Sequence, residues 1–127
     1  MAPPSVSSPP DPLPSSRVLH QLRIYEIFDR NKAAFHDRFR DHAARIMEQH
    51  GFRILGMWEA ATDDRAEFVY LLEWPDVDTM AAAWSRFMAD EEWAEIKRTT
   101  RLRHGDLVGE IESRVLDPVP YSPSRVG

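Results

Sequence analysis

The sequence predicts an α+β fold of order β-α-β-β-α-β, the ferredoxin-like arrangement with an antiparallel four-stranded sheet. Two observations lead to this prediction. Four short segments rich in β-branched and aromatic residues have the pattern of strands, and the segments between them repeat apolar residues at helical spacing. At 127 residues the chain has the length of one domain.

The first strand is expected over residues 18–27, VLHQLRIYEI. Leu22 and Ile24 lie on one face of it, and the residues between and beside them lie on the other, as in a half-buried strand. Asp29 or Asn31 is placed to cap the helix that follows.

The first helix is indicated by a stripe of residues at three- to four-residue spacing, with charged residues elsewhere. The stripe consists of Phe35, Phe39, Ala43, Ile46 and His50. Gly51 directly after His50 is a natural residue to end the helix.

A β-hairpin is expected next, from strands at 52–61 and 65–74 joined by a turn at 62–64. Pro75 ends the second strand, and Asp76 is placed to cap a second helix. The inward stripe of that helix is expected to be Met80, Ala83, Trp84 and Phe87.

A further short helix is expected after Asp90, which can cap it, with Trp93, Ile96 and Thr100 on its inner side. The last strand is expected at about 106–116, where apolar and charged residues alternate.

The two ends of the chain differ from this central domain, which is expected over 17–116. Residues 1–16 consist mostly of Pro, Ser and small residues, and we expect a disordered leader. Residues 117–127 form a Pro-rich tail that contains DPVPYSP, which can form neither a helix nor a central strand. The leader has no pattern of a secretory signal, and no stretch approaches the roughly 20 apolar residues of a membrane span.

Composition narrows the setting and the partners. The chain has no cysteine, which excludes disulfides and thiolate chemistry and fits a cytoplasmic location. Its net charge is −5, with 16 basic and 21 acidic residues mixed along the chain, so nucleic acid is not expected as a partner. One sheet face should be left bare by the helices and should carry apolar and aromatic side chains. We therefore expect a homodimer with the sheets packed face to face.

With these elements placed, the chain resembles the NIPSNAP family, a branch of the dimeric α/β-barrel superfamily. The stretches that carry the resemblance are QLRIYEI, FHDRFRDHAARIMEQHGFRILGMWEA, FVYLLEWPD, AAWSRFMADEEWAEIK and IESRVLDPVPYSP. The resemblance implies the ferredoxin-like fold and the dimeric barrel, and it makes the YSP tail a closing motif of the family. The wider superfamily performs oxygenation, cyclisation and isomerisation without cofactors, which implies a possible activity only at the level of the fold.

His42 is the first candidate for chemistry. It borders the apolar stripe of the first helix, and it stands where the family motif has a histidine. A half-buried imidazole suits proton transfer or hydrogen bonding to a ligand. The alternative is a histidine at the edge of the core, bonded to a carbonyl or a carboxylate.

Five further residues are candidates on the sheet. Arg23 and Tyr25 share one face of the first strand and would orient an oxygen atom of a substrate, whereas Trp58, Tyr70 and Glu112 would contact the ligand. Aromatic rings beside a guanidinium suit a planar or anionic small molecule. The alternative is structural: the aromatic residues fill the dimer barrel, and the charged residues form salt bridges.

No cofactor or metal is expected. The five histidines form none of the spacings of a zinc site, and there is no motif for nucleotide binding or for a serine hydrolase. Some members of the wider superfamily hold haem through a histidine, for which His42 or His104 would be the candidates.

Two functions remain open from the sequence. The first is a small cofactor-independent enzyme or binding protein that takes an aromatic or polyketide-like metabolite between the sheet and the first helix, with His42 as acid or base. The second is a non-catalytic dimeric module that binds a protein through the leader or the tail.

Overall fold

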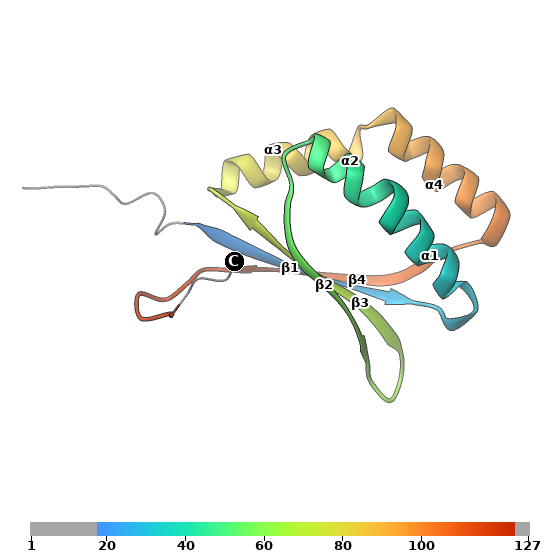
Figure 1. The fold of residues 1–127 in the computed structure, drawn as a ribbon, viewed down its shortest axis with the longest axis horizontal. Helices are drawn as coiled ribbons and strands as arrows, with labels where there is room; N and C mark the ends of the chain where they lie inside the picture. The colour runs from blue at the N-terminus through green and yellow to red at the C-terminus, as the bar shows by residue number, and fades with distance from the viewer. Residues whose placement is uncertain (1–17, 124–127) are drawn as a thin grey trace, which may run out of the picture.

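The computed structural model describes residues 18–123, and the expectations for residues 1–16 and for the end of the tail lie outside that range. Four antiparallel strands form one sheet in the order β2-β3-β1-β4. The helices all lie on one face of the sheet (Figure 1). The elements are β1 (Leu19–Ile27), η3 (Asp29–Asn31), α1 (Lys32–Arg38), η4 (Phe39–Ala43), α2 (Ala44–Gln49), β2 (Arg53–Ala61), β3 (Ala66–Trp74), α3 (Val77–Met88), α4 (Glu91–His104) and β4 (Val108–Leu116). The predicted ferredoxin-like fold is confirmed.

The first helix runs without interruption through α1, η4 and α2, and η4 is a π-helical turn. Its predicted stripe from Phe35 to Ile46 is buried against the sheet. The helix ends at Gly51, as expected, where a φ of 91° lets the amide of Phe52 reach back to the carbonyl of Met47 at 3.0 Å.

The start of this helix differs from the expectation. Neither Asp29 nor Asn31 caps it through a side chain. The amide of the buried Asn31 instead donates to the carbonyls of His104 and Asp106, at 3.2 and 3.0 Å. These carbonyls lie at the last residue of α4 and two residues after it, so the side chain of Asn31 is satisfied there and ties the end of α4 to the start of α1.

The two later helices begin as predicted. Asp76 accepts a hydrogen bond from the amide of Thr79 at 2.7 Å, and Asp90 accepts one from the amide of Trp93 at 2.8 Å. The second of these helices, α4, has 14 residues and is longer than the short helix expected.

Alternation divides the sheet into two faces. Gln21, Arg23 and Tyr25 of β1 pair with Leu72, Tyr70 and Phe68 of β3, and this row lies beneath the helices. The other face carries Leu22 and Ile24, with Leu71 and Val69 opposite them, all half-buried. No helix covers this second face in the described part of the chain (Figure 1), so we refer to it as the bare face.

A β-bulge changes the alternation of β2. Ile54 pairs with Leu72 but Gly56 pairs with Leu71, so Leu55 is left without a partner on β3. After the bulge Trp58 lies opposite Val69, on the bare face, with 54% of its surface exposed.

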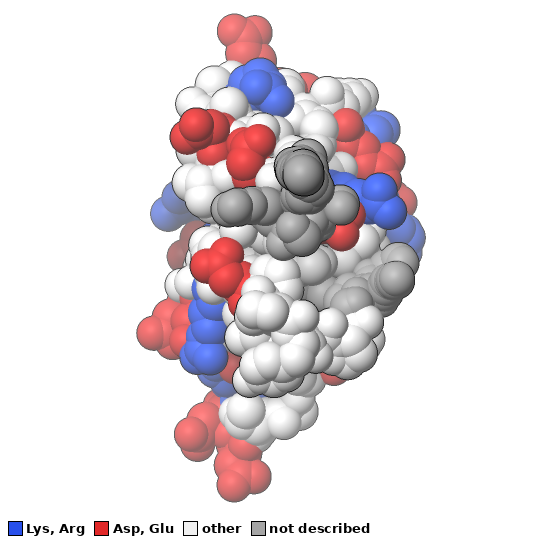
Figure 2. All heavy atoms as spheres, turned by 90° about the vertical axis from the view of Figure 1, so that its left-hand side faces the viewer, with Lys and Arg blue, Asp and Glu red and all other residues white. Residues whose placement is uncertain are grey.

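The tail after β4 has no helix or strand up to residue 123. A single turn bonds the amide of Ser122 to the carbonyl of Val119 at 3.0 Å, and Tyr121 is 86% exposed. Figure 2 views the end of the molecule at the left of Figure 1, where acidic and basic side chains are interspersed around uncharged surface. Among the helices of the described range, none has the length and apolar composition to cross a membrane.

Candidate functional site

A polar network lies on β1, beneath the helices. The carboxamide oxygen of Gln21 accepts hydrogen bonds from the indoles of Trp74 and Trp84, at 3.0 and 2.8 Å. Its nitrogen donates to the hydroxyl of Ser113 on β4 at 2.9 Å. This network holds α3 on the sheet beside Arg23.

Arg23 contacts two phenols and one indole. Its guanidinium donates to the hydroxyls of Tyr70 and Tyr25, at 3.5 and 3.4 Å, and the two hydroxyls are 2.5 Å apart. The guanidinium carbon lies 4.3 Å from the centre of the Trp84 ring. Burial raises the pKa of Tyr70 well above its usual value, and Tyr25 adds to this while Arg23 opposes it. Tyr70 is therefore a neutral phenol at physiological pH.

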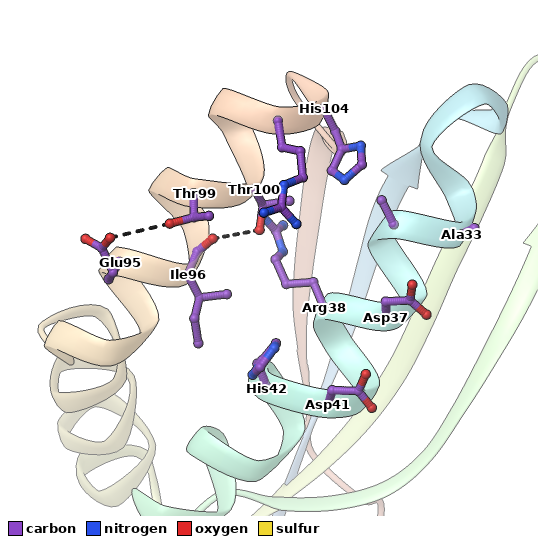
Figure 3. A pocket seen from close by; sticks show the side chains of 12 residues that line it. Ala33, Asp37, Arg38, Asp41, His42, Glu95, Ile96, Thr99, Thr100 and His104 are labelled. Atoms are coloured by element: carbon purple, nitrogen blue, oxygen red, sulfur yellow. Dashed lines mark hydrogen bonds between the residues drawn. The ribbon is translucent and has the colours of Figure 1, made fainter.

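One layer further out, a pocket of about 500 Å³ lies between the first helix and α4. Its lining residues are Ala33, Ala34, Asp37, Arg38, Asp41, His42, Glu95, Ile96, Thr99, Thr100, Arg103 and His104. Figure 3 shows His42 and Arg38 on one side of the pocket and Ile96, Thr100 and His104 on the other. This volume lies within the range of about 300–1,000 Å³ that is usual for small-molecule sites.

His42 belongs to the π-helical turn η4. Turns of this kind are frequent at functional sites, because they displace side chains from the regular helical positions. The imidazole is half-buried, and its Nδ1 lies 3.4 Å from a guanidinium nitrogen of Arg45. It is not bonded to a carboxylate or a backbone carbonyl among the described residues, in contrast to His36 and His50, which contact Glu59 and Asp90 at 2.5 and 2.8 Å.

Arg38 connects the pocket with the network on β1. Burial lowers the pKa of Arg38, and the nearby hydroxyl of Tyr25 opposes that change. Its guanidinium lies 5.3 Å from the centre of the Trp93 ring. Arg38 is thus close to Tyr25 at its inner side and lines the pocket at its outer side.

The structure brings together only some of the six predicted site residues. Arg23, Tyr25 and Tyr70 form one cluster under the helices, and His42 lines the pocket above them. Trp58 and Glu112 lie on the bare face, since they pair with Val69 and Ile24. Glu112 forms an ion pair with Arg114 at 3.1 Å.

Four lining residues were not predicted as site residues: Arg38, Thr99, Arg103 and Thr100, the last of which was expected only as an inner position of its helix. A signal was available for two of them: Arg38 precedes His42 by four residues and so shares its helix face, and Arg103 follows Ile96 by two helical turns. Both histidines considered for haem, His42 and His104, line this pocket. Within residues 18–123, no group of three His, Asp or Glu side chains is placed to hold a metal ion.

Solved structures with this fold come from several bacteria. An uncharacterized NIPSNAP-like domain protein from Burkholderia xenovorans matches with a TM-score of 0.71 and 20% identity, over 86% of this chain and 91% of that one. A NIPSNAP family protein of unknown function from Agrobacterium tumefaciens matches with a TM-score of 0.71 and 21% identity, over 85% and 94%. SnoaB, a cofactor-independent oxygenase from Streptomyces nogalater, matches with a TM-score of 0.52 and 18% identity, over 85% and 99%.

Two further comparisons bear on the family. No curated protein matches the chain. The family model described as NIPSNAP matches residues 20–123, which span the sheet, the helices and the YSP tail. The chain therefore belongs to the NIPSNAP family.

Proposed function

We propose that this NIPSNAP protein binds a small aromatic or polyketide-like molecule in the pocket between the first helix and α4, and that His42 transfers a proton to or from it. The observation that carries the proposal is the position of His42: half-buried, on a π-helical turn, and lining a pocket of about 500 Å³. An imidazole can accept or donate a proton through its ring nitrogens, so it can act as a general base or a general acid.

The rest of the site supports this role. Ala33, Ala34 and Ile96 supply the apolar wall of the pocket. Arg23, Tyr25 and Tyr70 do not line it; they bond one another on the sheet beneath the helices. The pocket lies between two helices, whereas the sequence led us to expect a cleft between the sheet and the first helix. That inner space is filled by packed rings, among them Phe35, Phe39 and Phe68.

Proton removal from a substrate carbon or hydroxyl is the step that cofactor-free oxygenation, cyclisation and isomerisation share. The similarity in fold to a cofactor-independent oxygenase agrees with this chemistry. Within residues 18–123, two imidazoles line the pocket without a carboxylate or carbonyl partner, His42 and His104. His42 is the half-buried one, whereas His104 is exposed at the end of α4.

We also propose that the protein forms a homodimer through the bare face. Trp58, Leu22, Ile24, Val69 and Leu71 leave an apolar area there that a second sheet would cover. In this arrangement Trp58 and Glu112 serve the interface and not the pocket.

Native mass spectrometry of the protein purified from its own host tests the pocket. We expect a bound small molecule that is released on mild denaturation and is absent or much reduced in His42→Ala, with the oligomer mass unchanged. His36→Ala is the matched control, because His36 lies on the same helix outside the pocket lining and pairs with Glu59. Equal ligand occupancy and equal turnover of that ligand in wild type and His42→Ala would exclude the role of His42.

A further inference from the structure

We infer that the ligand of this pocket carries an oxyanion, a carboxylate or a phosphate group, which Arg38 and Arg103 bind from the two facing helices. The inference rests on the proposed function only in taking the pocket as the ligand site, and it adds the chemical class of the ligand. The pocket lining contains three carboxylates and two arginines, and the ion pairs that each of them forms decide which charge a ligand meets.

The three carboxylates already have partners that lie outside the lining. Asp37 and Asp41 pair with Arg40 at 3.0 and 2.8 Å, and Glu95 pairs with Arg98 at 2.5 Å. Figure 3 shows Asp37 and Asp41 on the far side of the first helix from α4. These carboxylates are therefore poor partners for a cation inside the pocket.

The two arginines of the lining, in contrast, have no carboxylate partner among the described residues. Within residues 18–123, neither Arg38 nor Arg103 forms an ion pair with a carboxylate, although the flanking Arg101 pairs with Asp106 at 3.4 Å. Arg38 is half-buried against the ring of Trp93. A guanidinium stays charged at physiological pH, and a partly buried cation without a counter-ion is unfavourable until an anion reaches it. A planar guanidinium also matches a carboxylate or phosphate with two parallel hydrogen bonds.

The two threonine hydroxyls of the lining are also already hydrogen-bonded within α4. The hydroxyl of Thr100 donates to the carbonyl of Ile96 at 2.6 Å, and that of Thr99 donates to Glu95 at 3.4 Å. Their hydrogens are thus already used, which leaves the arginines and histidines as the donors that face the pocket.

The end of the pocket is held in a fixed shape. The buried amide of Asn31 bonds the carbonyls of His104 and Asp106, so the last turn of α4, which carries Arg103, is tied to the start of the first helix. A site whose donors are positioned in advance loses less conformational entropy on binding. With Ala33, Ala34 and Ile96 as apolar wall, the fitting ligand has an apolar body and one anionic group.

The test compares four probes on the full-length protein by isothermal titration calorimetry and ligand-observed NMR: 2-naphthoate, 2-naphthyl phosphate, the neutral 2-naphthamide, and inorganic phosphate. We expect at least one of the two naphthyl anions to bind about tenfold or more tightly than the amide. A charge-assisted hydrogen bond contributes about 1.5–3 kcal/mol, and about 1.4 kcal/mol corresponds to a factor of ten. Tighter binding of 2-naphthoate indicates a carboxylate site, whereas tighter binding of 2-naphthyl phosphate, together with binding of inorganic phosphate, indicates a phosphate site.

Three variants locate the effect. Arg103→Gln changes an exposed residue and should leave the fold intact, so it should weaken the preferred anion about tenfold without changing the amide. Arg38→Met should do the same, provided that its circular dichroism and melting temperature match the wild type. Arg101→Gln is the control and should bind as the wild type does, because Arg101 lies on the same helix outside the pocket lining and pairs with Asp106, which is also outside it.

Any of three results would overturn the inference. The first is equal affinity for the amide and the anions, and the second is equal affinity of Arg103→Gln and the wild type for the preferred anion. The third is no binding of any anion at about 10 mM, a concentration far above the usual range of specific ligands. His42→Gln separates it from the proposed function. Arginine-dependent anion binding together with unchanged turnover in His42→Gln supports the oxyanion site and excludes His42 as acid or base. Loss of activity in His42→Gln with no preference for anions excludes the oxyanion and leaves the role of His42 standing.

Discussion

Gln21 is a buried polar residue that links three elements on the helix-covered side of the sheet. It is 5% exposed, and its carboxamide bonds two indoles and one hydroxyl that belong to β3, α3 and β4. A polar side chain in this position is tolerated because every one of these bonds is made inside the fold. Its neighbour Arg23 is then held over the Trp84 ring.

Replacing Gln21 by Leu should lower the free energy of unfolding by about 2–4 kcal/mol, because the indole N–H groups of the buried Trp74 and the half-buried Trp84 lose their acceptor. Urea denaturation followed by tryptophan fluorescence measures this change. Ser113→Ala is the control, since it removes a single bond to an exposed residue and should change the free energy by about 1 kcal/mol or less. A Gln21→Leu variant as stable as the wild type would show that the indoles find other partners.

A second residue-scale prediction concerns Asp90, which links α4 to the end of the first helix. Its hydrogen bond with His50, followed by that from the amide of Trp93, lowers the pKa of Asp90 below the usual value of 3.8. The folded pKa is below the unfolded one, so this stabilisation is complete above about pH 4 and is lost as the pH falls through the folded pKa.

Asp90→Asn should therefore remove part of the loss of stability on acidification, because asparagine keeps the cap but does not titrate. Thermal melts between about pH 6 and pH 3, a range that brackets the usual carboxyl pKa, compare the slopes. Asp76→Asn is a useful comparison, since Asp76 also caps a helix but has no histidine partner. Parallel curves for Asp90→Asn and wild type would contradict the prediction.

The residues of the pocket show what the sequence could and could not predict at this scale. His42 was identifiable from its place beside the apolar stripe. Arg38 and Arg103 share helix faces with His42 and Ile96, but each lies among charged residues and has the pattern of a solvent-exposed position, so neither was predicted as a site residue. Only the packing of the first helix against α4 turns these two arginines toward a common pocket.

At the scale of elements, the sequence predicted correctly those helix starts that are capped by a residue of the same helix end. Asp76 and Asp90 each cap a helix through an amide three residues further on. Asn31 was expected to cap the first helix in the same way and does not. Its side chain bonds the carbonyls of His104 and Asp106 instead, which are 73 and 75 residues away along the chain. A pattern within one helix cannot reveal such partners.

Two glycines with positive φ, Gly51 and Gly105, follow the ends of helices. Gly51 has a φ of 91°, and Gly105 has a φ of 80° with a ψ of −159°, a region that essentially only glycine occupies. An added Cβ would meet nothing within 4 Å at Gly105 and only an ordinary contact at Gly51, so any loss of stability comes from the backbone.

We expect Gly105→Ala to destabilise the fold by about 1–3 kcal/mol and Gly51→Ala by about 1–2 kcal/mol. Asparagine should restore part of the stability at position 51 but not at position 105, because it tolerates the left-handed helical region. Chemical denaturation of the four variants provides the comparison. An equally tolerated asparagine at both positions would show that the turn after α4 can adopt another backbone conformation.

At the scale of the whole molecule, the order of elements was enough to predict the fold, because each strand and helix carries its own periodicity and the connections are short. The assignment of sheet faces was not predictable. β1 has polar and aromatic residues on the face beneath the helices and aliphatic residues on the bare face, so hydrophobicity alone points the wrong way. Side chains of Gln21 and Arg23 resolve this by bonding within the core.

The aliphatic bare face leads to a prediction about assembly. Val69→Asp should convert the proposed dimer into a monomer, since it places a charge opposite Ile24 and Trp58 in the middle of that face. Sedimentation velocity over a range of concentrations measures the mass. Met88→Asp is the control, because Met88 is an apolar residue 57% exposed on α3, in the helical layer. A wild-type monomer, or a dimer retained by Val69→Asp, would exclude the bare face as the interface.

The unpaired Leu55 of β2 has a consequence for how relatives of this chain can vary. Ile54 and Gly56 already pair with the adjacent residues Leu72 and Leu71, so deleting Leu55 would leave Trp58 on the bare face and Met57 and Glu59 on the helical side. Deleting a residue of the regular run after the bulge would instead turn the residues that follow it to the opposite face. Position 55 can therefore be lost without exchanging the residues offered to a partner for those offered to the core, whereas the run from 56 to 61 cannot be shortened by one residue without that exchange.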